Sequence, residues 1–292
     1  MALKPDTSTR KRIVTTFVVI GLILAGWAGS GRLLEWFESR QPMSTTSPEE
    51  LKEIARNGRI SGGLADAIRI LGSNKHYDDV VRLVANVCPK DDACPAALHR
   101  SSGEAYLHLN QEMEGRAELA AMLSENRTPL ENLDRLALAG NPEQYVAEVS
   151  TLLSGASPTE STPLEANNVA WGACLLPAKG VDLAKAKALA KGAVNRASPD
   201  EKATYLNTLG TVSFRMGNYK EAIATLNASE SSVSDPFNWP FLGAAYAKTG
   251  QTAKAREWFA KLETFLGTTF GSETTNRHEL LLFWFELRGS DE

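Results

Sequence analysis

Apolar residues from residue 64 to the end of the chain recur at the three- and four-residue spacings of amphipathic α-helices. No stretch of this region shows the alternation of apolar and polar residues that is typical of a strand. Candidate helix starts consist of a side chain that can accept a hydrogen bond, followed by proline. They are Ser47-Pro48, Thr128-Pro129, Asn141-Pro142, Ser157-Pro158, Thr162-Pro163, Ser198-Pro199 and Asp235-Pro236. The pattern therefore predicts an all-α fold.

Residues 203–266 contain the same helical hairpin twice, at a spacing of 33 residues (209 to 242). At that spacing Leu209-Gly210 aligns with Leu242-Gly243, Gly217 with Gly250, Ala222 with Ala255, and Leu226 with Phe259. A unit of this size cannot bury its apolar face alone and does so by stacking on its neighbours. The repeat therefore predicts a helical solenoid, in which small residues at 210 and 243 let the paired helices cross closely.

These positions resemble the signature of the tetratricopeptide repeat (TPR). With Ala203 and Pro236 as first positions, the Leu-Gly pairs occupy positions seven and eight. Positions four, eleven, twenty and twenty-four hold Leu206, Ser213, Ala222 and Leu226, then Trp239, Tyr246, Ala255 and Phe259. Upstream, residues 64–71 with 77–87, 96–109 with 117–123, and 132–139 with 145–153 are predicted as divergent hairpins. The resemblance implies a scaffold that binds other proteins.

A second resemblance covers roughly residues 165–288. Asn167-Asn168-Val169-Ala170-Trp171, then Cys174 and Tyr205-Leu206-Asn207-Thr208-Leu209-Gly210, follow the order found in the C-terminal TPR tail of planctomycete-type serine/threonine protein kinases. The kinase motifs themselves are missing: there is no glycine-rich phosphate loop, catalytic His-Arg-Asp or Asp-Phe-Gly. The resemblance implies a tail module without kinase activity.

The TPR resemblance also implies a concave groove lined by the first helix of each hairpin. The candidate groove residues are Thr204, Asn207, Thr211, Phe214, Arg215, Phe237, Ala244 and Lys248. They do not match the chaperone-tail clamp of that family, because Asn207 stands where the clamp has lysine.

The last predicted helix carries six consecutive apolar residues, 280–285, where a terminal solenoid helix usually shows water a polar face. One side is expected to pack on the preceding hairpin, and the other to need a partner, the groove or the membrane. The candidate docking residues are Leu281, Leu282, Phe283, Trp284 and Phe285. We expect charged residues at 282 and 283 to leave the fold intact and to abolish association.

The N-terminal residues have the pattern of a membrane-spanning helix. Residues 1–12 hold Lys4, Arg10, Lys11 and Arg12, and residues 13–31 contain no charged side chain. A helix of that length covers about 28 Å, close to the hydrocarbon thickness. The excess of basic residues before the span predicts a cytoplasmic N-terminus and an extracytoplasmic domain. Residues 32–48 are predicted to form the linker between the span and that domain. A cleaved signal peptide is the alternative, with Gly26-Trp27-Ala28 as an imperfect cleavage site.

The net charge, the histidines and the cysteines argue against several classes of partner and ligand. The net charge of −4 and the lack of a basic stripe argue against nucleic acid as a partner. The four histidines lack metal-ligand spacing, so no metal or cofactor is expected. Cys88 and Cys94 supply only two of the four ligands of a structural zinc, which favours a disulfide between them. Cys174 lies on an apolar helix and is expected to be buried.

Together these patterns predict a single-span inner-membrane protein with divergent hairpins at 49–160 and TPR units at 161–292. We expect a protein-interaction scaffold on the extracytoplasmic side, with no catalytic residues. A permanent subunit of a larger membrane complex is the alternative, and an enzyme with an unrecognised site comes third. The sequence leaves open the partner and whether the chain forms a homo-oligomer.

Overall fold

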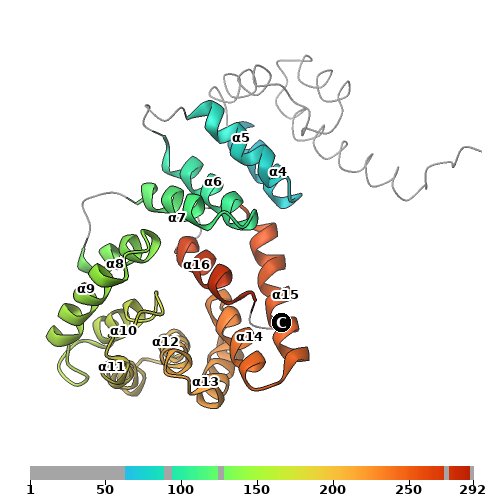
Figure 1. The fold of residues 1–292 in the computed structure, drawn as a ribbon. Helices are drawn as coiled ribbons and strands as arrows, with labels where there is room; N and C mark the ends of the chain where they lie inside the picture. Colours follow the sequence, from blue (N-terminus) through green and yellow to red (C-terminus); the bar gives the residue numbers. More distant parts are fainter. Residues whose placement is uncertain (1–62, 89–93, 124–127, 273–275, 290–292) are drawn as a thin grey trace, which may run out of the picture. The chain divides into compact units, whose positions relative to one another are not determined.

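Antiparallel helical hairpins stack one after another along the part of the chain that the computed structural model describes (Figure 1). The described residues are 63–88, 94–123, 128–272 and 276–289, and all lie in a unit that begins at Leu51. Within them are thirteen α-helices, one 3-10 helix and no strand. The prediction of an all-α fold is confirmed.

The helices pair in sequence order, so that each odd-numbered helix packs against the helix before it. The first pairs are α4 (Gly63–Ser73) with α5 (Tyr77–Val87), α6 (Ala96–His108) with α7 (Glu112–Ala121), and α8 (Pro129–Leu138) with α9 (Pro142–Gly155). They continue with α10 (Pro163–Gly172) and α11 (Leu183–Arg196), α12 (Lys202–Arg215) and α13 (Tyr219–Ser232), and α14 (Trp239–Lys248) and α15 (Thr252–Thr268). The 3-10 helix η2 (Pro236–Asn238) precedes α14, and α16 (Arg277–Leu287) follows the last hairpin.

Capping side chains start several of these helices where the sequence predicts. The Asn141 side chain accepts a hydrogen bond from the backbone N–H of Gln144, 3.1 Å away. Thr162 does the same for the N–H of Glu165 at 3.2 Å, and proline follows each cap. The bonds satisfy donors that the first helical turn leaves unpaired.

Two of the predicted starts are wrong in detail. Ser157-Pro158 begins a single turn, because a helix started there would carry Pro163 in its second turn, where proline lacks an N–H and clashes with the preceding turn. The helix begins only at Pro163. After Ser198-Pro199 another turn intervenes, and α12 begins at Lys202. Ser47-Pro48 lies outside the described residues.

Two glycines stand where paired helices cross. A Cβ atom built on Gly210 would lie 2.5 Å from Leu226 Cγ, and one on Gly243 would lie 3.0 Å from the Phe259 ring. Both partners belong to the second helix of the same hairpin and are buried. The internal repeat thus has a steric basis, because both hairpins need a small residue at the crossing.

We expect Gly243→Leu to destabilise the protein by about 1–3 kcal/mol through overpacking against Phe259. Gly210→Leu should cost more, since the approach there is closer. Urea denaturation followed by circular dichroism measures both. The control is Gly267→Leu in α15, where a Cβ meets nothing within 4 Å. Equal stability of the Gly243 and Gly267 variants would contradict the steric account.

Helix α16 returns to the first hairpins and joins them to the last ones. It packs against both α14 and α6, and α15 contacts α4 (Figure 1). At its start, the Arg277 guanidinium pairs with the Glu104 carboxylate of α6 and donates to the Leu266 carbonyl at 2.9 Å. Near its end, Glu286 pairs with Arg215 of α12. Charged contacts therefore fix this helix at both ends.

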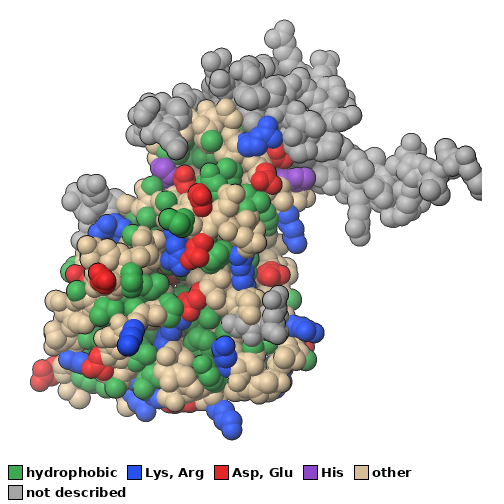
Figure 2. Space-filling model, in the orientation of Figure 1, with side chains coloured by type: hydrophobic (Ala, Val, Ile, Leu, Met, Phe, Trp, Pro, Cys, Tyr) green, Lys and Arg blue, Asp and Glu red, His purple; other side chains and the backbone are tan. Residues whose placement is uncertain are grey.

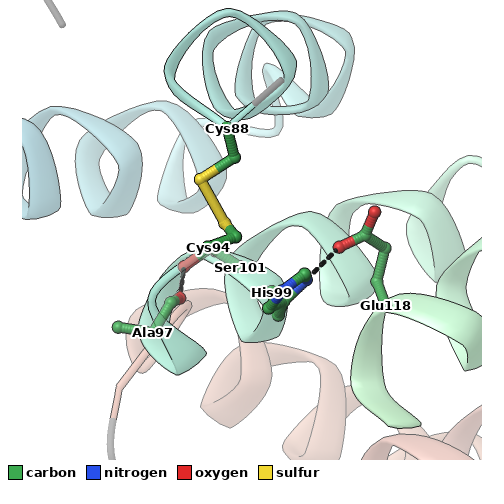
Figure 3. The surroundings of a disulfide bond; sticks show 6 residues. All are labelled: Cys88, Cys94, Ala97, His99, Ser101 and Glu118. Carbon is green, nitrogen blue, oxygen red and sulfur yellow. Dashed lines mark hydrogen bonds and ion pairs between the residues drawn. A yellow bond between two sulfur atoms is a disulfide. The ribbon is translucent and has the colours of Figure 1, made fainter. Parts of the chain in front are cut away.

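A disulfide joins Cys88, just after α5, to Cys94, just before α6 (Figure 3). The Cα atoms are 5.3 Å apart, within the usual range for such a bond. Beside it, His99 of α6 contacts Glu118 of α7 at 2.8 Å. Cys174 is buried and not bonded to another cysteine.

No described helix has both the length and the apolar character needed to cross a membrane. The predicted span at 13–31 and the linker at 32–48 lie outside the described residues. On the face of the molecule in Figure 2, acidic and basic side chains are interspersed. That face carries no field of one sign that would attract a polyanion.

Candidate functional site

A cleft of about 180 Å³ opens between α10, α12, η2 and the start of α16. Amide, hydroxyl, carboxyl and aromatic side chains line it together. They are Asn167, Asn168, Trp171, Thr204, Asn207, Thr208, Asp235, Phe237, Asn276 and Glu279. No lysine or arginine lies among these residues.

Hydrogen bonds between neighbouring hairpins hold one wall of the cleft. Asn207 Nδ2 on α12 donates to Asn238 Oδ1 on η2 at 2.8 Å, and Asn238 Nδ2 donates in turn to Glu230 at 3.1 Å. The Phe237 ring packs edge-on to Trp171, with 5.7 Å between centroids. Side chains from three hairpins are therefore fixed in place before any ligand arrives.

Asn167 has an acceptor without a partner. It is 5 % exposed, and its Oδ1 receives no hydrogen bond from the described residues. Its Nδ2 lies 3.4 Å from Asn168 Oδ1, a long contact. Since a buried carbonyl oxygen without a donor costs free energy, this oxygen is an unsatisfied acceptor on a residue of the cleft lining.

Three buried titratable side chains lie together behind the α16 end of the cleft. Glu279 Oε2 accepts from Trp171 Nε1 at 2.8 Å, and Asp134 of α8 lies 3.3 Å from His278 Nε2. Potential ligand atoms of Asp134, His278 and Glu279 all lie within 4.8 Å of one another. Burial raises the pKa of Glu279 well above its ordinary value and the Asp134 charge raises it further, while the bond from Trp171 lowers it.

The structure brings only part of the predicted groove to this cleft. Thr204, Asn207 and Phe237 line it. Thr211, Phe214 and Ala244 are buried. Arg215 forms an ion pair with Glu286. Lys248 is exposed but does not line the cleft. The physical reason is α16, whose side chains pack on α14 and pair with α12, and so cover the surface expected to be open.

The exposed face expected for the terminal helix is absent. Leu281, Leu282, Phe283 and Trp284 are at most 4 % exposed, and Phe285 is half-buried. Phe283 packs on the rings of Phe241 and Trp171, at centroid distances of 4.8 and 5.6 Å. The expectation of an uncovered docking face is corrected, because the chain itself encloses the helix on both sides.

Sequence reasoning missed most of the cleft's polar residues as site residues. Asn167, Asn168 and Trp171 carry a usable signal, since separations of three and four place 168 and 167 beside 171 on a helix. Asp134 and His278 carry none, because they belong to remote helices. Glu279 precedes the apolar run and is indistinguishable from an acid that favours a helix start.

The chain matches no protein-family model and no curated protein, so the chemistry of this cleft is inferred from its geometry.

Proposed function

We propose that this protein is a membrane-anchored, TPR-like scaffold that binds a segment of a partner protein in the cleft between α10, α12 and η2. The observation that carries the proposal is the cleft's wall of amides and aromatic rings, built from side chains of three hairpins. Asparagine offers both donors and an acceptor, which suits the N–H and C=O groups of a peptide. Trp171 and Phe237 add apolar surface for a side chain of that peptide.

The size and charge of the cleft favour part of a polypeptide over other ligands. Its volume of about 180 Å³ is below that of typical small-molecule pockets, about 300–1,000 Å³. The lining offers no lysine or arginine that could pair with a phosphate group. We therefore propose that a short segment with N–H donors binds there and that the rest of the partner lies outside.

The extracytoplasmic location is part of the same proposal. It rests on the basic residues before the apolar run at 13–31, and the Cys88–Cys94 disulfide supports it because such bonds persist in oxidising compartments. The alternative, a permanent subunit docked through its terminal helix, loses its main argument because α16 is enclosed.

A cleft-blocking substitution tests the proposal. Thr204 is exposed at the cleft, so Thr204→Arg should fill it without disturbing the core, and co-purification of partner proteins should fall at least tenfold. Tagged full-length protein is purified from detergent-solubilised membranes, and the bound proteins are quantified by mass spectrometry. Thr151→Arg, at an exposed position on α9 outside the cleft, is the matched control. Identical partner sets for both variants and the unmodified protein would refute the cleft as the binding site.

A further inference from the structure

Asp134, His278 and Glu279 form a buried cluster of two carboxyl groups and one imidazole. In the described part of the chain, neither carboxyl group pairs with a lysine or arginine. The two arginines adjacent to these residues in sequence bond elsewhere, Arg277 to Glu104 and Arg135 to Asn132. With a neutral imidazole and both carboxyl groups ionised, the cluster carries two negative charges. Since buried charges require compensation, a cation or a retained proton must supply it.

His278 supplies an independent observation. The residue is 8 % exposed, and its Nε2 forms no hydrogen bond with the described residues, although Asp134 Oδ2 lies only 3.3 Å away. A nitrogen and an oxygen at this separation without a hydrogen bond fit two ligands of one ion. Ligands about 2.0–2.1 Å from a tetrahedral zinc ion are separated by about 3.3 Å. The observed distance equals that separation.

We propose that Asp134, His278 and Glu279 bind a divalent transition metal of the zinc type. One imidazole and two carboxylates suit Zn²⁺ better than Mg²⁺ or Ca²⁺, which favour oxygen ligands alone. The bond from Trp171 Nε1 holds one oxygen of Glu279 in place, as hydrogen bonds around metal sites commonly do, and an ion would replace the proton that Glu279 and Asp134 otherwise share. All three ligand atoms lie within 4.8 Å of one another.

The position of the site gives the metal a role that goes beyond the proposed function. Asp134 belongs to α8, whereas His278 and Glu279 belong to α16, so the ion links two helices that are remote in sequence. Glu279 also lines the cleft. The ion therefore fixes one end of the cleft.

Metal analysis of the full-length protein tests the proposal. Protein stripped with chelator and dialysed against micromolar Zn²⁺ should retain one zinc per chain and melt at a higher temperature than the stripped form. X-ray absorption should show one imidazole nitrogen and oxygen ligands at about 2.0–2.2 Å, with no sulfur. Asp134→Asn and His278→Gln should each weaken zinc binding more than about 100-fold, because loss of a ligand exceeds the 10–100-fold effect of a supporting residue.

The matched control is His99→Gln, which removes a histidine that pairs with Glu118 outside the cluster and should leave zinc binding unchanged. Unmodified protein that retains no zinc would overturn the proposal in favour of a proton shared by Asp134 and Glu279. Folded Asp134→Asn and His278→Gln variants that bind zinc normally would overturn it too. If both variants fail to fold, the absorption spectrum of the unmodified protein decides, since sulfur or oxygen ligands alone exclude this site. Failure here leaves the partner-binding result of Thr204→Arg unaffected.

Discussion

Replacing Leu282 with lysine and Phe283 with glutamate is expected to unfold the protein. Both side chains are buried, and Phe283 packs between the rings of Phe241 and Trp171. Loss of a buried phenylalanine alone costs about 3–5 kcal/mol, and burial of unpaired charges adds to it. Because typical domains are stable by about 5–15 kcal/mol, the sum removes most or all of the folded population. Far-ultraviolet circular dichroism and urea denaturation measure the loss.

The matched control introduces the same two charges at exposed apolar positions. Met113 on α7 is 83 % exposed and Leu164 on α10 is 57 % exposed, so Met113→Lys with Leu164→Glu should change stability by less than about 1 kcal/mol. A folded Leu282/Phe283 variant with near-normal stability would show that α16 is not enclosed, and would restore it as a candidate docking surface.

Arg277→Met is expected to destabilise the protein by about 3–5 kcal/mol, because it leaves the Glu104 carboxylate buried without its partner. Arg277 and Glu104 are 2 % and 0 % exposed, and the guanidinium also bonds the carbonyl of Leu266 and the hydroxyl of Thr269. Burial raises the pKa of Glu104, while Arg277 and the backbone N–H of Gly271 lower it. Removing the arginine therefore drives Glu104 toward protonation, and urea denaturation reports the remaining stability.

A double-mutant cycle separates the ion pair from simple loss of packing. Glu104→Leu together with Arg277→Met should be more stable than Arg277→Met alone, since no uncompensated charge remains. The exposed Arg256 of α15 provides the control, and Arg256→Met should stay within about 0.5 kcal/mol of the unmodified protein. A cycle with no coupling energy would contradict the assigned importance of the pair.

The helices and much of their pairing could be predicted from the sequence alone, because these depend on local signals. Apolar spacing marks the buried side of each helix, and capping bonds such as those of Asn141 and Thr162 mark its start. The Leu-Gly repeat identified the close crossings at Gly210 and Gly243, since the residue that must be small lies at a fixed position in each hairpin. Even the error at Ser157-Pro158 had a local cause, the second proline at 163.

Two features depend on long-range packing instead: what covers the apolar run at 280–285, and where the site lies. A helix that is apolar all round is predicted to be buried, but its own pattern does not say what surrounds it. Here the surroundings are α14, α6 and the rings of Trp171 and Phe241, and this enclosure covers most of the predicted groove. Asp134 meets His278 for the same reason, because packing of α16 brings together residues whose spacing along the chain carries no signal.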